Sequence, residues 1–191
     1  QDGRQIETWM SVSVMRNDAG RVVQHVRVFS DISALKAQQR ELIAQARHDS
    51  LTGLPNRRAF EERLDQAIAR ARRSKQTLAV LYVDLDGFKS INDQHGHAVG
   101  DQLLMEVSRR LQSCVRTTDT VCRLAGDEFT VILEGAGHMT EVDRICGRIV
   151  DKLSLPQELK GCAVAVSSSV GVAVWEMGET PDSVCVRADK A

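Results

Sequence analysis

One uninterrupted apolar run constrains the fold of this chain more than any other feature of its sequence. The run is Thr77–Val83, T-L-A-V-L-Y-V, and it lacks the polar alternation of a strand with one wet face. A strand of this kind is buried on both faces, because neither set of its side chains suits water. The chain is therefore expected to form a sheet with this strand in its interior.

Segments with helical periodicity alternate with further strands around this run. We expect helices at 56–73, 88–93, 100–115, 139–153 and 181–191. We expect strands at 118–123, 128–133 and 163–175, the first two joined in a hairpin about Ala125-Gly126. Helices interleaved with a mostly antiparallel sheet predict the α+β class and a ferredoxin-like palm.

The N-terminal part has a different pattern. Apolar residues alternate in 5–16, as in a half-buried strand, and a second strand is expected at 22–30 after a turn. Two strands alone are marginal in water, so this hairpin is either the end of a larger sheet or an addition to the next domain. Good helix formers follow at 33–48, with Asp31 as the predicted N-cap. That helix is either a solvated linker or a short coiled-coil stalk that holds two copies together.

Composition excludes several classes of protein. Hydrophobic residues make up 42% of the chain and charged residues 27%, which is typical of a globular domain. The formal net charge of -1 provides no basic field, so nucleic acid is not an expected partner. The five cysteines are scattered without a C-x-x-C pair, as expected of a reduced, cytoplasmic chain. No apolar run is long enough to span a bilayer, and a membrane anchor upstream of Gln1 stays an open alternative.

Two acids follow the buried run directly. The sequence after Val83 is D-L-D-G-F-K, residues 84–89. A buried carboxylate is tolerated only when it is paired or bound to a metal, so a buried strand gains nothing structurally from ending in acids. Asp84 is therefore a candidate residue of a metal or phosphate site. An acidic turn that faces water is the alternative.

A second acidic pair, Asp127-Glu128, lies at the tip of the predicted hairpin. Adjacent acids at a turn are usually solvated, so this pair by itself favours a surface turn. Together with Asp84 on a neighbouring strand, it forms a group of carboxylates suited to Mg²⁺, which prefers oxygen ligands and substrate phosphates. The two clusters together predict a magnesium-dependent phosphate site.

Polar residues in the next helical segments extend this site toward a nucleotide. Gly87 allows the backbone to approach a phosphate, and Lys89 lies in the first turn of a helix whose N-terminus attracts anions. Asn92 falls on the same helix face as Lys89. Asp101 begins the following helix, where its carboxylate can accept two N–H bonds from a guanine edge. An ordinary helix cap is the alternative for Asp101.

Four motifs, in order along the chain, resemble the diguanylate cyclase (GGDEF) family. They are D-S-L-T-G-L-P-N-R-R at 49–58, D-L-D-G-F-K-S-I-N-D at 84–93, H-G-H with G-D at 95–101, and R-L-A-G-D-E-F at 123–129. The resemblance extends from 49 to 191. It implies a nucleotide-cyclase palm and a reaction that condenses two GTP into cyclic di-GMP, with release of pyrophosphate, across a homodimer of facing domains.

The resemblance also implies a role for each acid. Asp84, the Leu85 carbonyl and Asp127 would hold Mg²⁺, with Mn²⁺ as the alternative ion. Glu128 would be a further metal ligand or a catalytic acid, beside Asp127. The metal would neutralise the triphosphate and lower the pKa of the attacking 3′-hydroxyl.

Substrate contacts follow from the same resemblance. Asn92 and Asp101 would read guanine, while Gly87, Phe88 and Lys89 would bind the phosphates. Because each domain supplies half of the reaction site, two copies must meet, and the predicted linker helix gives them a means to do so.

A further motif, Arg116-Thr117-Thr118-Asp119, resembles the inhibitory R-x-x-D site of the family, which binds the product cyclic di-GMP. The guanidinium of Arg116 can bind phosphate or guanine with two parallel hydrogen bonds, and Asp119 can accept guanine N–H groups. The alternative is a surface ion pair, which contributes little to stability.

The sequence departs from the family pattern at two places. Ala125 stands where the family has its first glycine, and its methyl group would crowd the hairpin if that position needs φ > 0. The family pattern also continues after Ala191 into a helix with a lysine and an arginine that contact the phosphates. Two functions therefore stay open: an active cyclase, and a GTP- or cyclic di-GMP-binding regulatory module that controls an attached phosphodiesterase domain.

The N-terminal strand, turn, strand, D-I-S and helix resemble the C-terminal end of a PAS sensor domain with its signalling linker. The chain is thus divided into a PAS-like hairpin at 1–32, a linker helix at 33–48 and a cyclase domain at 49–191.

Overall fold

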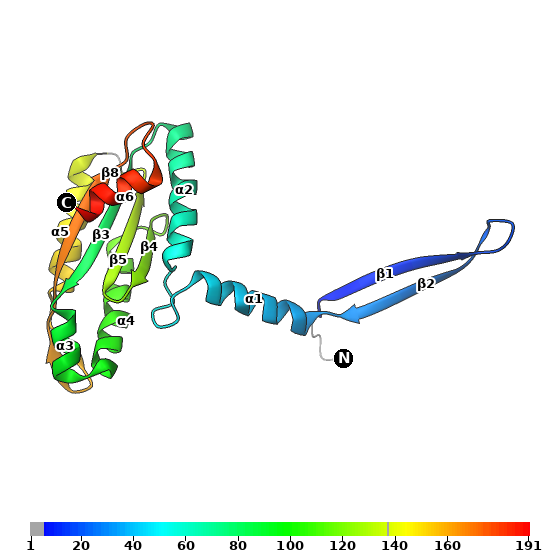
Figure 1. The fold of residues 1–191 in the computed structure, drawn as a ribbon, viewed down its shortest axis with the longest axis horizontal. Helices are drawn as coiled ribbons and strands as arrows, with labels where there is room; N and C mark the ends of the chain where they lie inside the picture. Colours follow the sequence, from blue (N-terminus) through cyan, green and yellow to red (C-terminus); the bar gives the residue numbers. More distant parts are fainter. Residues whose placement is uncertain (1–5, 137) are drawn as a thin grey trace. The chain divides into compact units, whose positions relative to one another are not determined.

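The computed structural model describes residues 6–136 and 138–191 and divides the chain into two compact units, 1–46 and 47–191 (Figure 1). Within the described ranges, no helix combines the length and the apolar character needed to cross a membrane.

An antiparallel hairpin dominates the N-terminal unit, with β1 at Thr8–Arg16 and β2 at Val22–Asp31. Its turn depends on Asn17, whose side-chain oxygen accepts hydrogen bonds from two backbone N–H groups of the turn at 3.2 and 3.0 Å. Both faces of the hairpin are exposed, with Trp9 (58%) on one face and Met10 (53%) on the other. The half-burial predicted from the alternating pattern is therefore not found in this hairpin, because no second layer among the described residues of this unit covers either face. The predicted strand start at Gln5 lies outside the described residues.

Helix α1 (Ser33–Arg47) follows the hairpin. The carboxylate of Asp31 accepts a hydrogen bond from the Ser33 N–H at 2.9 Å, as predicted for the start of this helix. Leu35 and Leu42, two turns apart, are exposed (65% and 59%). α1 thus carries an apolar stripe that its own unit does not cover.

The C-terminal unit is built on a four-stranded antiparallel sheet in the order β4-β5-β3-β8. The strand bounds are Leu78–Asp86 for β3, Thr120–Ala125 for β4, Glu128–Glu134 for β5 and Ser167–Val174 for β8. With helices between the first and second and the third and fourth of these strands, this is the ferredoxin-like topology. The predicted α+β class is confirmed.

Helices cover both faces of this sheet (Figure 1). One core lies between the sheet and α4 and α5, and a second lies between the sheet and α2 and α6. α3 packs on α4 at one end of the sheet. The helix bounds are Arg57–Ser74 for α2, Phe88–His95 for α3, His97–Cys114 for α4, Met139–Leu153 for α5 and Pro181–Asp189 for α6.

The side chains of β3 alternate between these two cores, and this alternation places the acids. One set is buried in the core of α4 and α5: Ala79, Leu81, Val83 and Leu85. The other set faces α2 and α6 and begins with Leu78 and Val80. By the two-residue period of a strand, the second set continues through Tyr82 to Asp84 and Asp86. The acids were predicted to follow a strand ending at Val83, but β3 runs through both of them to Asp86, where they become exposed.

The single long strand predicted at 163–175 is wrong. Its first part, β7 (Cys162–Val164), turns back and pairs with β6 (Gln157–Leu159), and only the second part, β8, joins the main sheet. The turn between β6 and β7 contains Lys160 and Gly161 with φ of 49° and 78°, a left-handed pair that closes a two-residue hairpin. The sequence does not mark this break, because alanine and valine recur on both sides of it.

Candidate active site

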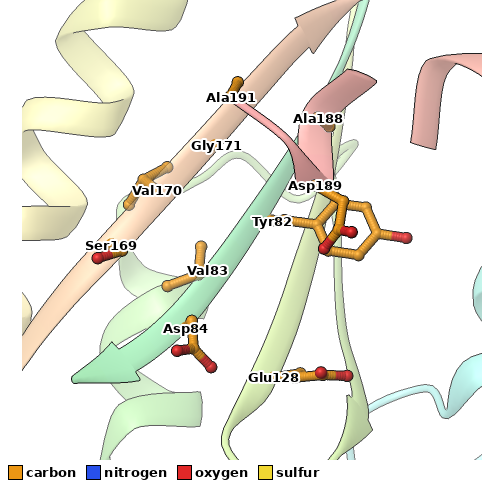
Figure 2. Close-up of a pocket in the computed structure, with 10 residues that line it drawn as sticks. All are labelled: Tyr82, Val83, Asp84, Glu128, Ser169, Val170, Gly171, Ala188, Asp189 and Ala191. Atoms are coloured by element: carbon orange, nitrogen blue, oxygen red, sulfur yellow. The ribbon is translucent and has the colours of Figure 1, made fainter. Parts of the chain in front are cut away.

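The sheet face that carries Asp84 is hollowed into a cavity of about 410 Å³ (Figure 2). Strand register explains its floor: Asp84 lies opposite Glu128 on β5 and Ser169 on β8, so the three side chains share one face. The other lining residues come from β3, β8 and the C-terminal end of the chain: Tyr82, Val83, Val170, Gly171, Ala188, Asp189 and Ala191.

The wall of this cavity depends on a close approach of α6 to β8. A Cβ atom added to Gly171 would lie 2.0 Å from the carbonyl oxygen of Ala188. Only glycine allows the last turn of α6 to lie so near the strand. The small residue at 171 therefore fixes the distance between the wall and the floor that Asp84 occupies.

Electrostatic repulsion acts on Asp84. Burial raises the pKa of this carboxyl above its ordinary value, and the negative charges of Asp127, Asp86 and Glu128 raise it further. Within 6–136 and 138–191, the side chains of Asp84 and Asp127 form no hydrogen bond or ion pair with the protein. An approaching cation would relieve this repulsion, so the cluster is suited to bind one.

The acids fit a cation that takes few ligands from protein. In the described part of the chain, no three His, Cys, Asp or Glu side chains are arranged to hold a metal ion by themselves. Mg²⁺ is usually bound through one or two carboxylates, with the remaining positions filled by substrate phosphates and water. Leu85 is buried on the opposite face (1% exposed), so it can contribute only its backbone carbonyl. Asp84 and Asp127, with that carbonyl, suit this manner of binding.

Glu128 has a partner that sequence reasoning missed. Arg57, in the first turn of α2, lies 3.6 Å from its carboxylate, and both side chains are more than half exposed. An exposed pair at this distance contributes little to stability. Glu128 can therefore exchange Arg57 for a ligand at small cost. Arg57 stands in the first motif, 49–58, but nothing in its spacing indicated contact with the hairpin.

The hairpin accommodates Ala125 without strain. Gly126 has φ of +49°, whereas Ala125 has no positive φ, the non-glycine residues with positive φ among those described being Lys75 and Lys160. Ala125 is exposed and ends β4, opposite Glu128. The left-handed position of the turn is thus filled by glycine, and the methyl group of Ala125 does not crowd the backbone.

The predicted guanine-binding residues lie where α3 packs on α4. Asn92 is half-buried, and a Cβ atom added to Gly100 would lie 1.9 Å from its side-chain oxygen. The carboxamide of Asn92 therefore occupies the space that Gly100 leaves, next to Asp101. Asp101 and Lys89 are exposed. These three side chains form a polar edge of the predicted site. Neither they nor Asp127 line the acidic cavity around Asp84.

Phe88 and Gly87 form the start of α3. Gly87 is the N-cap residue with φ of 74° and no side-chain cap, and Phe88 packs partly into the core of α4 and α5. The first turn of α3 therefore has backbone N–H groups without a capping side chain, and such groups can bind an anion.

The R-x-x-D motif has partners within the domain. The two carboxylate oxygens of Asp119 accept hydrogen bonds from the N–H groups of Arg116 and Glu134, at 2.8 and 3.2 Å. The guanidinium of Arg116 forms an ion pair with Glu141 of α5. Arg116 and Asp119 both line another cavity, of about 440 Å³, whose other lining residues include His48 and Arg63. The ion pair considered as the alternative, between Arg116 and Asp119, is therefore not formed among the described residues, and the guanidinium of Arg116 pairs with Glu141 instead.

A ferredoxin-like sheet with acids on its two central strands is the architecture of a nucleotide-cyclase palm. Residues 46–191 match the family model described as Diguanylate cyclase, GGDEF domain, and the chain belongs to that family.

Similar proteins carry related names. The chain is 41% identical over 160 residues to the bifunctional diguanylate cyclase/cyclic di-GMP phosphodiesterase MucR of Pseudomonas aeruginosa, covering 83% of this chain and 23% of MucR. It is 40% identical over 159 residues to the diguanylate cyclase TpbB of the same organism, covering 82% of this chain and 37% of TpbB. The chain thus spans well under half of either relative.

A solved structure shares the fold over most of this chain. It contains the coiled coil and GGDEF domain of DgcB from Caulobacter crescentus in complex with c-di-GMP. It superposes with a TM-score of 0.78 and 29% identity, covering 84% of this chain and 85% of that one.

Proposed function

We propose that this chain is a diguanylate cyclase: it binds GTP with Mg²⁺, or with Mn²⁺ in its place, and condenses two GTP into cyclic di-GMP and pyrophosphate. The observation that carries the proposal is the repulsion among the acids on β3 and β5, which raises the pKa of Asp84 and leaves that carboxylate without a partner in the described chain. A site of this kind gains most from a cation that brings its own anionic ligand.

The metal would be held by Asp84, the Leu85 carbonyl and Asp127, with Glu128 as a further ligand or as a catalytic acid. When bound, it supplies charge neutralisation for the triphosphate and polarises the phosphorus that is attacked. Glu128 lies opposite Asp84 across the β3–β5 pair, so it can turn toward the same cation once it leaves Arg57.

The substrate is proposed to extend from the acids along α3. Gly87, Phe88 and Lys89 would bind phosphates through the uncapped first turn and the exposed lysine. Asn92 and Asp101 would read guanine, because an amide and a carboxylate together can satisfy the donors and the acceptor of its edge.

Two domains are proposed to meet face to face, since each holds one GTP and the reaction needs both. The exposed apolar stripe of α1 and the exposed hairpin are the surfaces that we assign to a linker and to a PAS-like sensor part. Arg116 and Asp119 would hold the product cyclic di-GMP and keep the domains apart. We assign the domain to the cytoplasm, because its proposed substrate GTP is supplied there.

Ala125 favours a second candidate function. Ala125 replaces the first glycine of the family pattern. If this replacement prevents turnover, the domain is a GTP- or cyclic di-GMP-binding module that regulates an attached phosphodiesterase. The absence of positive φ at Ala125 removes the backbone objection to turnover, and we therefore prefer the cyclase.

Incubation of the chain with GTP and Mg²⁺ over a range of protein concentrations tests the proposal. Chromatography should detect cyclic di-GMP and pyrophosphate, formed at a rate that rises more than linearly with protein concentration. GTP binding without product at high concentration would favour the regulatory module. Absence of GTP binding would overturn the cyclase, and absence of both GTP and cyclic di-GMP binding would overturn both functions.

A further inference from the structure

Arg123, on β4, forms hydrogen bonds with the backbone of the turn that carries Asp127 and Glu128. The side chain of Arg123 is only 10% exposed. Its Nε and Nη2 both donate to the carbonyl oxygen of Gly126, at 2.9 and 2.7 Å. Its Nη1 donates to Oδ1 of Asp49 at 2.9 Å. One guanidinium therefore joins the hairpin to the first motif of the domain.

Asp49 is itself held in place by the turn that it begins. Its Oδ1 also accepts hydrogen bonds from the N–H and the hydroxyl of Thr52, at 2.8 and 2.6 Å. Burial alone would raise the pKa of Asp49, but the hydrogen bonds from Thr52 and Arg123 outweigh it and hold the pKa below its ordinary value. The backbone adds a further link, because the Arg123 N–H donates to the Pro55 carbonyl at 2.9 Å.

The bonded carbonyl is the one that leads into the acids. Gly126 has no side chain to restrain its backbone, and its peptide bond connects directly to Asp127. A planar fork with two hydrogen bonds to one oxygen fixes the orientation of that peptide unit, which a single ammonium group would not do.

We propose that Arg123 is a positioning residue for Asp127, and that Asp49 orients Arg123. The segment through which the chain enters its C-terminal unit thereby fixes the position of the acidic hairpin. This inference rests on the proposed function, in which Asp127 holds the metal. Neither Arg123 nor Asp49 contacts substrate in the proposal. Arg123 acts through the Gly126 peptide, and Asp49 acts through Arg123.

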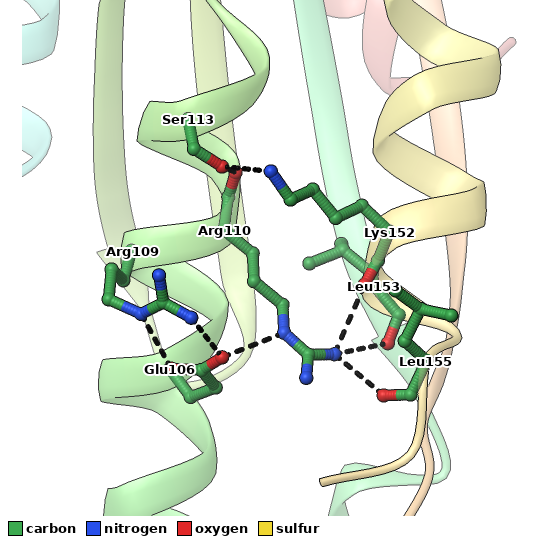
Figure 3. Close-up of polar contacts among 7 residues, drawn as sticks. All are labelled: Glu106, Arg109, Arg110, Ser113, Lys152, Leu153 and Leu155. Carbon is green, nitrogen blue, oxygen red and sulfur yellow. Dashed lines mark hydrogen bonds and ion pairs between the residues drawn. The ribbon is translucent and has the colours of Figure 1, made fainter.

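A second buried arginine supplies the matched control (Figure 3). Arg110 on α4 is 9% exposed in its side chain and binds Glu106 through Nε at 2.9 Å. Its Nη1 donates to the carbonyl oxygens of Lys152, Leu153 and Leu155, at 3.1, 3.4 and 2.7 Å. Like Arg123, it ties one carboxylate to backbone carbonyls, but it does so at the end of α5, outside the acidic cavity.

The test compares Arg123→Lys with Arg110→Lys in the full chain. Both are expected to lower the melting temperature. Arg123→Lys should also raise the Mg²⁺ concentration needed for half-maximal GTP binding by about tenfold or more, the size of effect seen when a group that orients a metal ligand is lost. Arg110→Lys should leave that concentration within about twofold. An equal Mg²⁺ dependence in the two variants would overturn the inference.

Hydrogen exchange supplies a readout that needs no nucleotide. Arg123→Lys should speed amide exchange in 124–129 while Arg110→Lys should not, and exchange unchanged by Arg123→Lys would also overturn the inference. Asp49→Asn keeps an oxygen for Thr52 but removes the charge that faces Arg123. It should therefore shift the Mg²⁺ dependence in the same direction, and less than additively with Arg123→Lys. If the unsubstituted chain fails to bind GTP, the proposed function fails, and hydrogen exchange still decides the role of Arg123.

Discussion

Carboxylates in two regions of this domain are treated in opposite ways. Glu106 on α4 and Glu179 in the loop before α6 each face an arginine. Hydrogen bonds from Arg109 lower the pKa of Glu106 to about 2, and hydrogen bonds from Arg187 lower that of Glu179 to about 2. In the cavity on β3, burial and neighbouring acids raise the pKa of Asp84.

The difference distinguishes carboxylates that stabilise the fold from carboxylates that are available to bind a ligand. A chain that supplies arginine forks to its structural carboxylates, and none to Asp84, leaves an unfavourable interaction in the unbound protein. Function then opposes stability at Asp84, while Glu106 contributes to stability alone.

The largest effect is expected from Asp84→Asn. Loss of a metal ligand should reduce cyclic di-GMP formation by about 10³-fold or more, since the metal stabilises most of the developing charge in phosphoryl transfer. The same change should raise the free energy of unfolding at pH 7, because repulsion is relieved. Chromatography of products and thermal denaturation measure the two effects. Lower stability together with lost activity would contradict the comparison.

Glu106→Gln should behave in the opposite way. It leaves the buried guanidinium of Arg110 without its carboxylate, at an expected loss of about 1–3 kcal/mol in the free energy of unfolding. Turnover per folded molecule should be unchanged. Urea denaturation and initial rates at a temperature below the transition provide the measurements, with Asp84→Asn as the counterpart of equal charge change.

The acid limb of stability supplies a third test. The folded-state pKa values of about 2 for Glu106 and Glu179 lie below the ordinary value of 4.5, so their contribution is complete above pH 4.5. It is lost as the pH falls from 4.5 toward 2. Denaturation between pH 2 and 7 should show this fall, and Glu106→Gln should flatten it. The gain from Asp84→Asn should instead fade at low pH, where Asp84 is already protonated.

The polar edge formed by Asn92 and Asp101 offers a further test. Asp101 is exposed, as Asp84 is, and we assign both carboxylates to ligand binding. Gly100→Ala would push the Asn92 carboxamide out of the space beside it. GTP affinity should fall by about threefold to tenfold, the loss of one or two hydrogen bonds, with a smaller preference over ATP. Titration with both nucleotides measures the change. If selectivity stays intact, guanine is read elsewhere.

The smallest effect on basal activity is expected at Arg116. Its pair with Glu141 is exposed on the arginine side, so Arg116→Ala should change the free energy of unfolding by less than about 1 kcal/mol. Initial rates should be unchanged, while inhibition by added cyclic di-GMP should weaken by about tenfold. Rates measured with and without product check this. Unaltered inhibition would place Arg116 with Glu106, among the structural charges.

Sequence reasoning located the acids but not their surroundings. The apolar run and the motifs were sufficient to predict β3, the hairpin and the acids Asp84, Asp127 and Glu128. The face on which the acids lie follows from the two-residue period once β3 is seen to extend to Asp86. The partners were inaccessible, because Arg57 and Arg123 reach the hairpin through tertiary packing that no local spacing records.

Other errors have the same origin. The strand predicted at 163–175 breaks because β7 finds a local partner in β6, a pairing that the alanine- and valine-rich sequence does not reveal. The hairpin β1–β2 has the alternation of a half-buried sheet, yet burial depends on what covers a strand and not on its pattern.

The alternation along β3 also protects the fold against error. A slip of one residue in its pairing would turn Asp84 and Asp86 into the core beneath α4 and α5 and bring Leu85 out to water. Each carboxylate would then be desolvated without a partner, which makes the shifted sheet far less stable than the correct one. Asp84, which we assign to the metal, thus also sets the register together with Asp86. A variant with apolar residues at both positions would lose a safeguard against misfolding along with a metal ligand.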